Sequence, residues 1–170
     1  MENPNPDVDV AIPSESVLDR LTLADIEAMS NEYDAVTADE IFSLLKDIKD
    51  PEHPELSLAQ LRVVRLDQVY VYETVGSCCV LVEYTPTIPT CSVAVLIGLT
   101  LLRKLQLCVP KRFRTFVRIK EGKHVQEQQV NKQLADKERV AAAMENPNLS
   151  KTVRNGVYKT DIIPEHLLIW

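Results

Sequence analysis

A proline-rich turn followed by a long apolar run, from Thr85 to Leu102 (TPTIPTCSVAVLIGLTLL), is the feature that most constrains the fold. Pro86 and Pro89 fix their backbone angles and lack amide donors, so the segment before Cys91 is predicted to be a stiff extended turn. From Ser92 the chain carries no charge for eleven residues. That run is far shorter than the ~20 residues of a bilayer span, and it predicts a buried helix.

Cys91 is the candidate functional thiol. Thr90 or Cys91 is expected at the N-cap of this helix, where unpaired amides and the helix dipole favour an anion. A thiol held there is expected to ionise more readily than a free one. The alternative is that Cys91 is a small buried hydrophobic residue, which is the role we expect for the cysteines inside apolar segments, Cys78, Cys79 and Cys108.

Charge divides the chain into two parts. Residues 1–40 hold eleven acidic residues against one basic residue, whereas residues 41–170 hold 14 acidic and 18 basic residues. We interpret residues 1–35 as an acidic, largely disordered segment. The N-terminus lacks the pattern of a secretory signal, and no cysteine spacing is typical of zinc sites, so reduced thiols in the cytoplasm or nucleus are expected.

The remaining pattern predicts an α/β (α+β) domain in which helices cover a small mixed β-sheet. Thr37 and Glu40 have the spacing of a capping box at the start of a helix that is expected to stop at Asp50. Two or three strands are predicted between residues 61 and 84, with a hairpin turn at residues 75–77. A further strand is predicted near residues 112–120, followed by helices at residues 124–135 and 136–146. A short helical piece, a turn at Asn155-Gly156 and an apolar tail complete the pattern.

The strand near residues 112–120 alternates between core and solvent, and Phe116 is predicted to point outward with the basic residues. Eight basic residues and one acidic residue lie between Arg103 and Lys123. A solvated strand face explains this better than a nucleic-acid site, because aromatic interleaving is thin. An aromatic residue exposed among Arg114 and Arg118 is typical of a protein interface.

A thiol enzyme would need a base beside Cys91. His124, His53, Glu127 and Asp136 are the candidates, and an enzyme or redox protein that uses Cys91 with His124 is one alternative function. A purely structural interaction module is another. The chain has four glycines and no glycine-rich phosphate loop, so nucleotide binding is not expected.

Three ordered blocks carry a family resemblance: DIKDPEHPELSLAQLRVV, VEYTPTIPTCSVAVLIGL and VNKQLADKERVAAAMEN. Over roughly residues 39–153 the chain resembles the eukaryotic cytosolic iron–sulfur assembly family with the SufT/PaaD-like domain, subunits of the complex that delivers clusters to apoproteins. The resemblance implies a domain over residues 36–155 and an extension over residues 156–170 whose apolar end, at Trp170, is expected to dock on this domain or on a partner.

The resemblance implies a non-enzymatic adaptor in the cytoplasm, and also in the nucleus. Its expected partners are a WD-repeat propeller protein, a HEAT-repeat scaffold and iron–sulfur apoproteins, with homodimerisation left open and no membrane or nucleic acid involved. No tightly bound cofactor is expected, and iron or an iron–sulfur cluster is expected only transiently. An indirect link with chromosome segregation would follow from cluster supply to DNA enzymes.

The family's reactive cysteine falls on Cys91, which is also the expected transient metal ligand. The family motif usually reads Pro-His-Cys-Ser, whereas Thr90 stands here in place of the histidine. The residues expected to support the thiol are Thr90, Ser92, Asp50, Glu52, His124 and Glu127. The residues that match the other family blocks fit an interface or a loop-fixing network equally well: Asp50, Pro51, Glu52, Glu127, Asn131, Lys132, Asp136, Lys137 and Arg139. Arg114, Phe116, Arg118 and Trp170 are further interface candidates.

Overall fold

A computed structural model describes residues 35–74 and 76–158. Internal contacts separate residues 1–35 from residues 36–170, and the description below concerns the second unit. The predicted disorder of the acidic segment and the predicted docking of Trp170 lie outside the described residues. Within the described ranges, no helix is long and apolar enough to cross a membrane.

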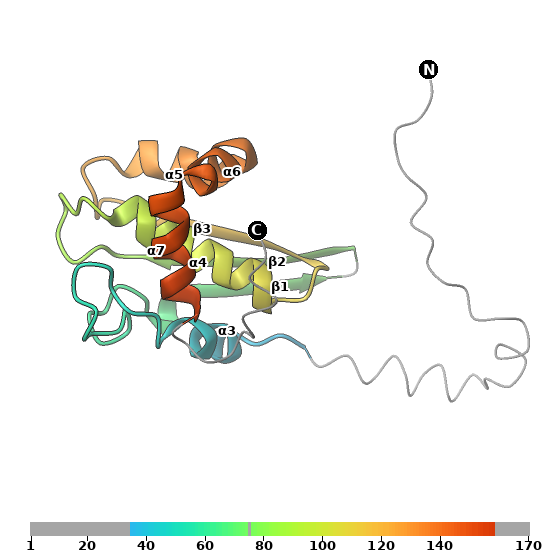
Figure 1. Cartoon of the computed structure of the whole chain (residues 1–170). Helices are drawn as coiled ribbons and strands as arrows, with labels where there is room; N and C mark the ends of the chain where they lie inside the picture. The colour runs from blue at the N-terminus through green and yellow to red at the C-terminus, as the bar shows by residue number, and fades with distance from the viewer. Residues whose placement is uncertain (1–34, 75, 159–170) are drawn as a thin grey trace, which may run out of the picture. The chain divides into compact units, whose positions relative to one another are not determined.

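The elements follow one another as a helix, a hairpin, a long helix, a strand and three helices (Figure 1). Their bounds are α3 Ala38–Leu45, η1 Leu66–Gln68, β1 Val69–Thr74, β2 Ser77–Tyr84, α4 Ala94–Cys108, β3 Phe113–Ile119, α5 Glu127–Ala135, α6 Lys137–Glu145 and α7 Pro147–Tyr158.

The sheet has the strand order β1-β2-β3. The β1 and β2 strands pair antiparallel across a turn in which Gly76 adopts a φ of +93°, a conformation that glycine reaches without strain. The β2 and β3 strands pair parallel, so the chain must cross over between them, and α4 makes that crossover. The predicted α+β fold with a small mixed sheet is therefore confirmed.

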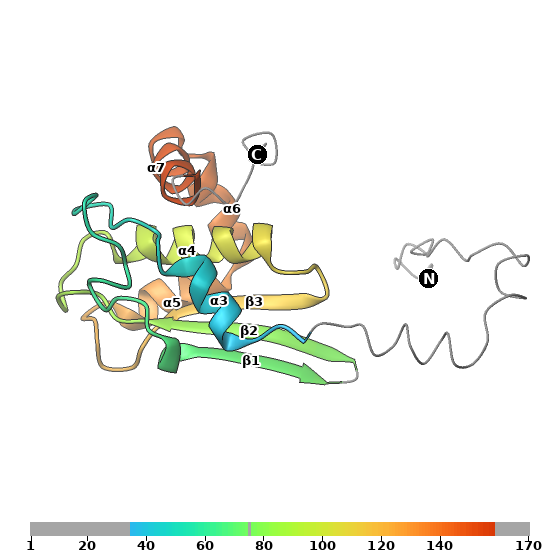
Figure 2. The same cartoon turned by 90° about the horizontal axis from the view of Figure 1, so that it is seen from below.

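Helices α3 and α4 lie on one face of the sheet, with α3 near β1 and α4 near β3, and α7 packs on α4 (Figure 2). Helix α5 packs against β3 and α4. Alternation in β3 follows the prediction, because Phe113, Val117 and Ile119 are buried while Phe116 is 46% exposed on the other face.

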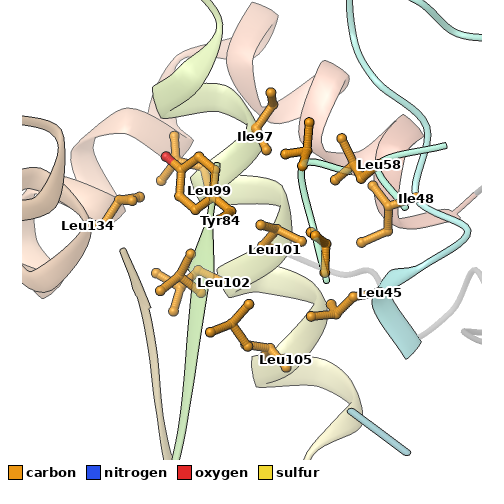
Figure 3. Close-up of a cluster of buried hydrophobic side chains, with 14 of the residues drawn as sticks. Leu45, Ile48, Leu58, Tyr84, Ile97, Leu99, Leu101, Leu102, Leu105 and Leu134 are labelled. Carbon is orange, nitrogen blue, oxygen red and sulfur yellow. The ribbon is translucent and has the colours of Figure 1, made fainter. Parts of the chain in front are cut away.

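The core forms where α4 meets the sheet and α3 (Figure 3). Tyr84, at the end of β2, is fully buried beneath α4, and its hydroxyl donates a hydrogen bond of 2.7 Å to the carbonyl of Ala94. Leu134 of α5 reaches the same place. A Cβ atom at Gly98 would lie 2.5 Å from Leu134 Cδ1 and 2.8 Å from the Tyr84 hydroxyl, so glycine is required for this close packing.

The capping box is confirmed, since the Thr37 hydroxyl accepts from the Glu40 N–H and the Glu40 carboxylate accepts from the Thr37 N–H. The predicted end of this helix at Asp50 is wrong, because α3 ends at Leu45. The chain then turns back, and the N–H of Leu58 donates to the carbonyl of Ile48. The N–H of Ala59 likewise donates to the carbonyl of Lys46. These bonds between the two segments take the place of a further helical turn after Leu45.

The predicted turn at Asn155-Gly156 is also wrong, because α7 continues through it to Tyr158. Gly156 lets α7 approach α4 closely, since a Cβ there would lie 2.9 Å from Thr100 Cγ2. Val153 and Val157 are fully buried on the same helix. The helix therefore crosses the predicted boundary between residues 155 and 156.

Gly98→Ala tests the packing between α4, Tyr84 and Leu134. Alanine is the better helix former by about 1 kcal/mol, yet the crowded Cβ is expected to lower the free energy of unfolding by about 1–3 kcal/mol. Urea denaturation followed by circular dichroism measures the change. Ser43→Ala, on the exposed side of α3, is the control and is expected to be neutral or slightly stabilising. A Gly98→Ala protein as stable as the parent would contradict the packing described here.

Candidate functional site around Cys91

The loop between β2 and α4 carries Cys91 and is held at several points. The Cys91 N–H donates to the carbonyl of Ile88 at 3.2 Å, and the Val125 N–H donates to the carbonyl of Pro89 at 2.9 Å. The loop is thus tied both to itself and to the segment that precedes α5. The rigid turn that the two prolines predict is consistent with this network.

The predicted N-cap is wrong. Helix α4 begins at Ala94, its N-cap is Val93, and no side chain of the described residues caps it. Thr90 and Cys91 therefore precede the helix, and the exposed Thr90 lies on the rim of the Cys91 cavity. The carbonyl of Cys91 instead accepts from the Ala94 N–H in a turn just before the helix, at 3.4 Å.

The thiol of Cys91 is buried, with the residue 4% exposed. Burial raises the pKa of Cys91, and the nearby carboxylates of Glu52 and Asp50 raise it further. Hydrogen bonds from the N–H groups of Val93 and Ala94 lower the pKa without cancelling these effects. The expectation of a readily ionised thiol is therefore corrected: the site favours the neutral form.

The carboxylates come from the loop after α3. Asp50 is 3% exposed, and its carboxylate accepts from the N–H groups of Glu52 and His53 at 2.7 and 2.9 Å. These bonds fix the loop, and the Ser92 hydroxyl then donates to Glu52 Oε1 at 3.2 Å. The structure thus brings Asp50, Glu52 and Ser92 to the neighbourhood of Cys91, although some 40 residues separate them in the chain.

His124 also reaches this site, through the backbone of Cys91. Its Nδ1 accepts from the Gln126 N–H at 3.1 Å, so its Nε2 carries the hydrogen and donates to the carbonyl of Cys91 at 3.1 Å. Both ring nitrogens are used. Within the described residues, no hydrogen bond joins the imidazole to the Cys91 sulfur.

A cavity of about 190 Å³ lies beside the thiol. Its lining combines the Cys91 loop, the first turn of α4 and the segment before α5: Thr90, Cys91, Ser92, Ala94, Val95, His124, Val125, Gln126 and Val130. Across residues 35–74 and 76–158, no group of three or more His, Cys, Asp or Glu side chains is arranged to hold a metal ion.

Several residues that the family resemblance points to have local structural roles. The Gly122 N–H donates to the Glu127 carboxylate at 2.6 Å, and Asn131 bonds both the N–H and the C=O of Ile119. Asp136 is the N-cap of α6 and pairs with Arg139 at 3.4 Å. These contacts favour the loop-fixing alternative for Glu127, Asn131 and Asp136, while Lys132 and Lys137 are exposed.

The predicted interface residues of β3 lie on the sheet face opposite α3 and α4. Arg114, Phe116 and Arg118 alternate with the core residues of this strand, and Arg118 pairs with Glu83 of β2 at 2.7 Å. They are not part of the Cys91 cavity. Trp170 lies outside the described residues.

Tyr84 is the site residue that sequence reasoning missed. It is fully buried, burial raises its pKa well above the usual range, and the nearby Cys91 raises the pKa further. Its bond to the Ala94 carbonyl fixes the start of α4 directly after the cysteine loop. The available signal was a tyrosine at a core-facing position at the end of an apolar strand, where a buried hydroxyl needs a partner.

Glu52→Gln tests the electrostatics of the thiol. Removing one negative charge while keeping an oxygen acceptor for Ser92 is expected to lower the Cys91 pKa and to raise its alkylation rate at pH 7 about two- to fivefold. Iodoacetamide labelling with peptide mapping by mass spectrometry measures Cys91 alone. Glu55→Gln, exposed in the same loop, is the matched control and should leave the rate unchanged. An unchanged or slower rate in Glu52→Gln would show that Glu52 does not act on the thiol.

No protein-family model matches the chain. The chain is, however, similar to several proteins across much of its length. It is 50% identical over 133 residues to an MIP18 family protein of Schizosaccharomyces pombe. This match covers 78% of this chain and 73% of the relative. It is 44% identical over 153 residues to the MIP18 family protein galla-2 of Drosophila melanogaster. This match covers 90% of this chain and 92% of the relative.

The chain is also 51% identical over 120 residues to cytosolic iron–sulfur assembly component 2B of Mus musculus, covering 71% of this chain and 72% of the relative. These matches confirm the resemblance inferred from the three sequence blocks. With such identity to relatives matched over more than two thirds of their length, the chain belongs to the MIP18 family, which includes proteins named cytosolic iron–sulfur assembly component 2B.

Proposed function

We propose that this chain is an adaptor that helps to deliver iron–sulfur clusters to cytosolic and nuclear apoproteins, with Cys91 as its functional thiol. Membership of a family whose mouse and Dictyostelium discoideum members are named cytosolic iron–sulfur assembly component 2B supports a role in cytosolic iron–sulfur assembly. The single observation that supports a functional role for Cys91 is its position beside a cavity, where loops from three parts of the chain meet.

The environment of the thiol suits temporary contact with a metal. Metal binding requires the thiolate, so the proton of Cys91 must leave when iron or a cluster binds. Clusters usually take about four thiolate ligands, whereas Cys91 supplies one. The protein alone would hold the cargo weakly, and the remaining ligands would come from the donor or the recipient. Such weak binding is suited to transfer.

The alternative of a thiol enzyme receives less support from the site. A cysteine nucleophile is activated by a base hydrogen-bonded to it. The two ring nitrogens of His124 are instead hydrogen-bonded to the Cys91 carbonyl and the Gln126 N–H. The raised pKa of Cys91 also leaves little thiolate at neutral pH. An adaptor without catalytic activity therefore fits these residues better.

The proposed partners are a WD-repeat propeller protein, a HEAT-repeat scaffold and iron–sulfur apoproteins. Family names that describe an assembly component support membership of a complex. A cytoplasmic location agrees with the same names, and action in the nucleus and a link with chromosome segregation stay predictions. Affinity isolation from native cytosol, with identification of WD-repeat and HEAT-repeat proteins among the recovered chains, tests the partner set.

Cys91→Ala tests the proposed function in cells. Budding yeast depleted of its own MIP18 family protein, which is 49% identical to this chain over 121 residues, would be complemented with the chain or its variants. The parent chain is expected to restore radioactive iron incorporation into a cytosolic iron–sulfur enzyme. Cys91→Ala is expected to leave incorporation at the level of depleted cells, because Cys91 is the one thiol among the described residues that line the cavity.

Cys79→Ala is the matched control, because Cys79 is a half-buried cysteine of β2 outside the cavity. It is expected to restore incorporation as the parent does. Equal restoration by Cys91→Ala, at equal protein abundance, would remove Cys91 from the function while leaving the family assignment in place.

A further inference from the structure

The outer edge of β3 has backbone groups available for pairing. This strand lies at one edge of the sheet. Asn131 bonds the N–H and C=O of Ile119 from outside the sheet, so Ile119 points its backbone groups away from β2. The direction of the backbone N–H and C=O groups alternates from residue to residue along a strand. The backbone groups of Val117 and Thr115 therefore also point away from β2. Within residues 35–74 and 76–158, no hydrogen bond to these outward groups is present.

A groove of about 1240 Å³ runs beside this edge. Its walls come from α4, from β3, from the end of α5 and from α6, and apolar side chains such as Leu102, Val140 and Met144 line it. Phe116, which is 46% exposed, stands at the strand side of the groove. An open strand edge beside an apolar groove is the arrangement that binds an extended peptide, with main-chain bonds on one side and pockets for alternate side chains on the other.

The charge of the groove indicates which peptides fit. Four of its lining residues are basic and one, Glu145, is acidic. Lys111, Arg114 and Lys137 are all exposed there. A peptide that carries acidic side chains would therefore be attracted, and a basic one repelled. Asn131 closes the edge at Ile119, so only a short segment beside residues 115–117 has room to pair.

We infer that an acidic, extended segment of a partner protein binds in this groove as an additional strand along β3. The site is distinct from the Cys91 cavity, with which it shares no lining residue. Cys91 precedes α4, whereas the groove begins at Leu99 and reaches Gln106 in the second half of that helix. Figure 2 shows the loop before α4 and the turn into β3 at opposite ends of the helix.

Fluorescence anisotropy tests the inference with the full chain and a labelled decapeptide of alternating valine and glutamate. Saturable binding is expected, and a peptide of alternating valine and lysine is expected to bind at least about tenfold more weakly because of the basic rim. Thr115→Pro removes an outward N–H, and proline is tolerated where an edge strand faces away from its neighbour. Loss of the main-chain bond is expected to weaken binding about threefold to tenfold.

Arg114→Glu gives a second readout that does not depend on the backbone, and Lys151→Glu, exposed on α7, makes the same charge change away from the groove. Arg114→Glu is expected to weaken binding and Lys151→Glu to leave it unchanged. Cys91→Ala should bind the peptide as the parent does, which separates this site from the proposed function. Circular dichroism confirms that each variant is folded.

Three results would overturn the inference. They are no saturable binding of the acidic peptide, equal binding of the basic one, or equal weakening by Arg114→Glu and Lys151→Glu. A second copy of the chain, pairing its β3 with β3, could occupy the same edge. Sedimentation of the same proteins tests this alternative by measuring whether they dimerise. A concentration-dependent dimer that Thr115→Pro dissociates would assign the edge to self-association, and would also overturn the peptide site.

Discussion

The hydrogen bond from the Tyr84 hydroxyl to the carbonyl of Ala94 joins the two parts on which the structure depends, the sheet and the crossover helix α4. It lies in the core, where a hydrogen bond is strong and an unpaired hydroxyl is costly. Tyr84 ends β2 and Ala94 begins α4, so the bond closes the base of the loop that carries Cys91. Gly98, one turn further along, lets Leu134 of α5 pack against the same tyrosine.

This arrangement explains how distant segments meet at the thiol. The loop after α3 contributes Glu52, and the segment before α5 contributes His124, each through a contact with the cysteine loop or its neighbour. The result is a thiol that the fold keeps neutral rather than one that it activates. A neutral buried thiol resists adventitious oxidation and alkylation, which is compatible with the proposed role, in which Cys91 would act only when cargo and partners are present.

Local pattern predicted much of the fold. The capping box of α3 and the alternation of β3 depend on neighbours within a few residues, and both are confirmed. The three sequence blocks also identified the family. The two errors in helix boundaries, in α3 and α7, have another cause, because each depends on contacts with residues farther along the chain. Helix α3 stops early to form bonds with the loop around Leu58, and α7 continues through Gly156 because that glycine packs on Thr100.

The thiol itself was the hardest feature to predict. Its position in the chain was evident, but its pKa depends on burial and on carboxylates some 40 residues away, which no local pattern records. The N-cap was misplaced because nothing in the sequence between Thr90 and Ala94 distinguishes a turn from a first helical turn. Asn131 and Asp136 were identified as important, while their local bonding roles became clear only from the structure.

The central claim, that Cys91 handles iron or a cluster during assembly, is tested most directly by alkylation of the chain within native cytosol. Labelling of Cys91 and Cys79 would be compared, by mass spectrometry of the isolated protein, in iron-replete extract and after treatment with an iron chelator. We predict that Cys91 is protected in iron-replete extract and that chelation removes the protection, while Cys79 labels equally in both. Labelling of Cys91 that does not respond to iron would contradict the claim.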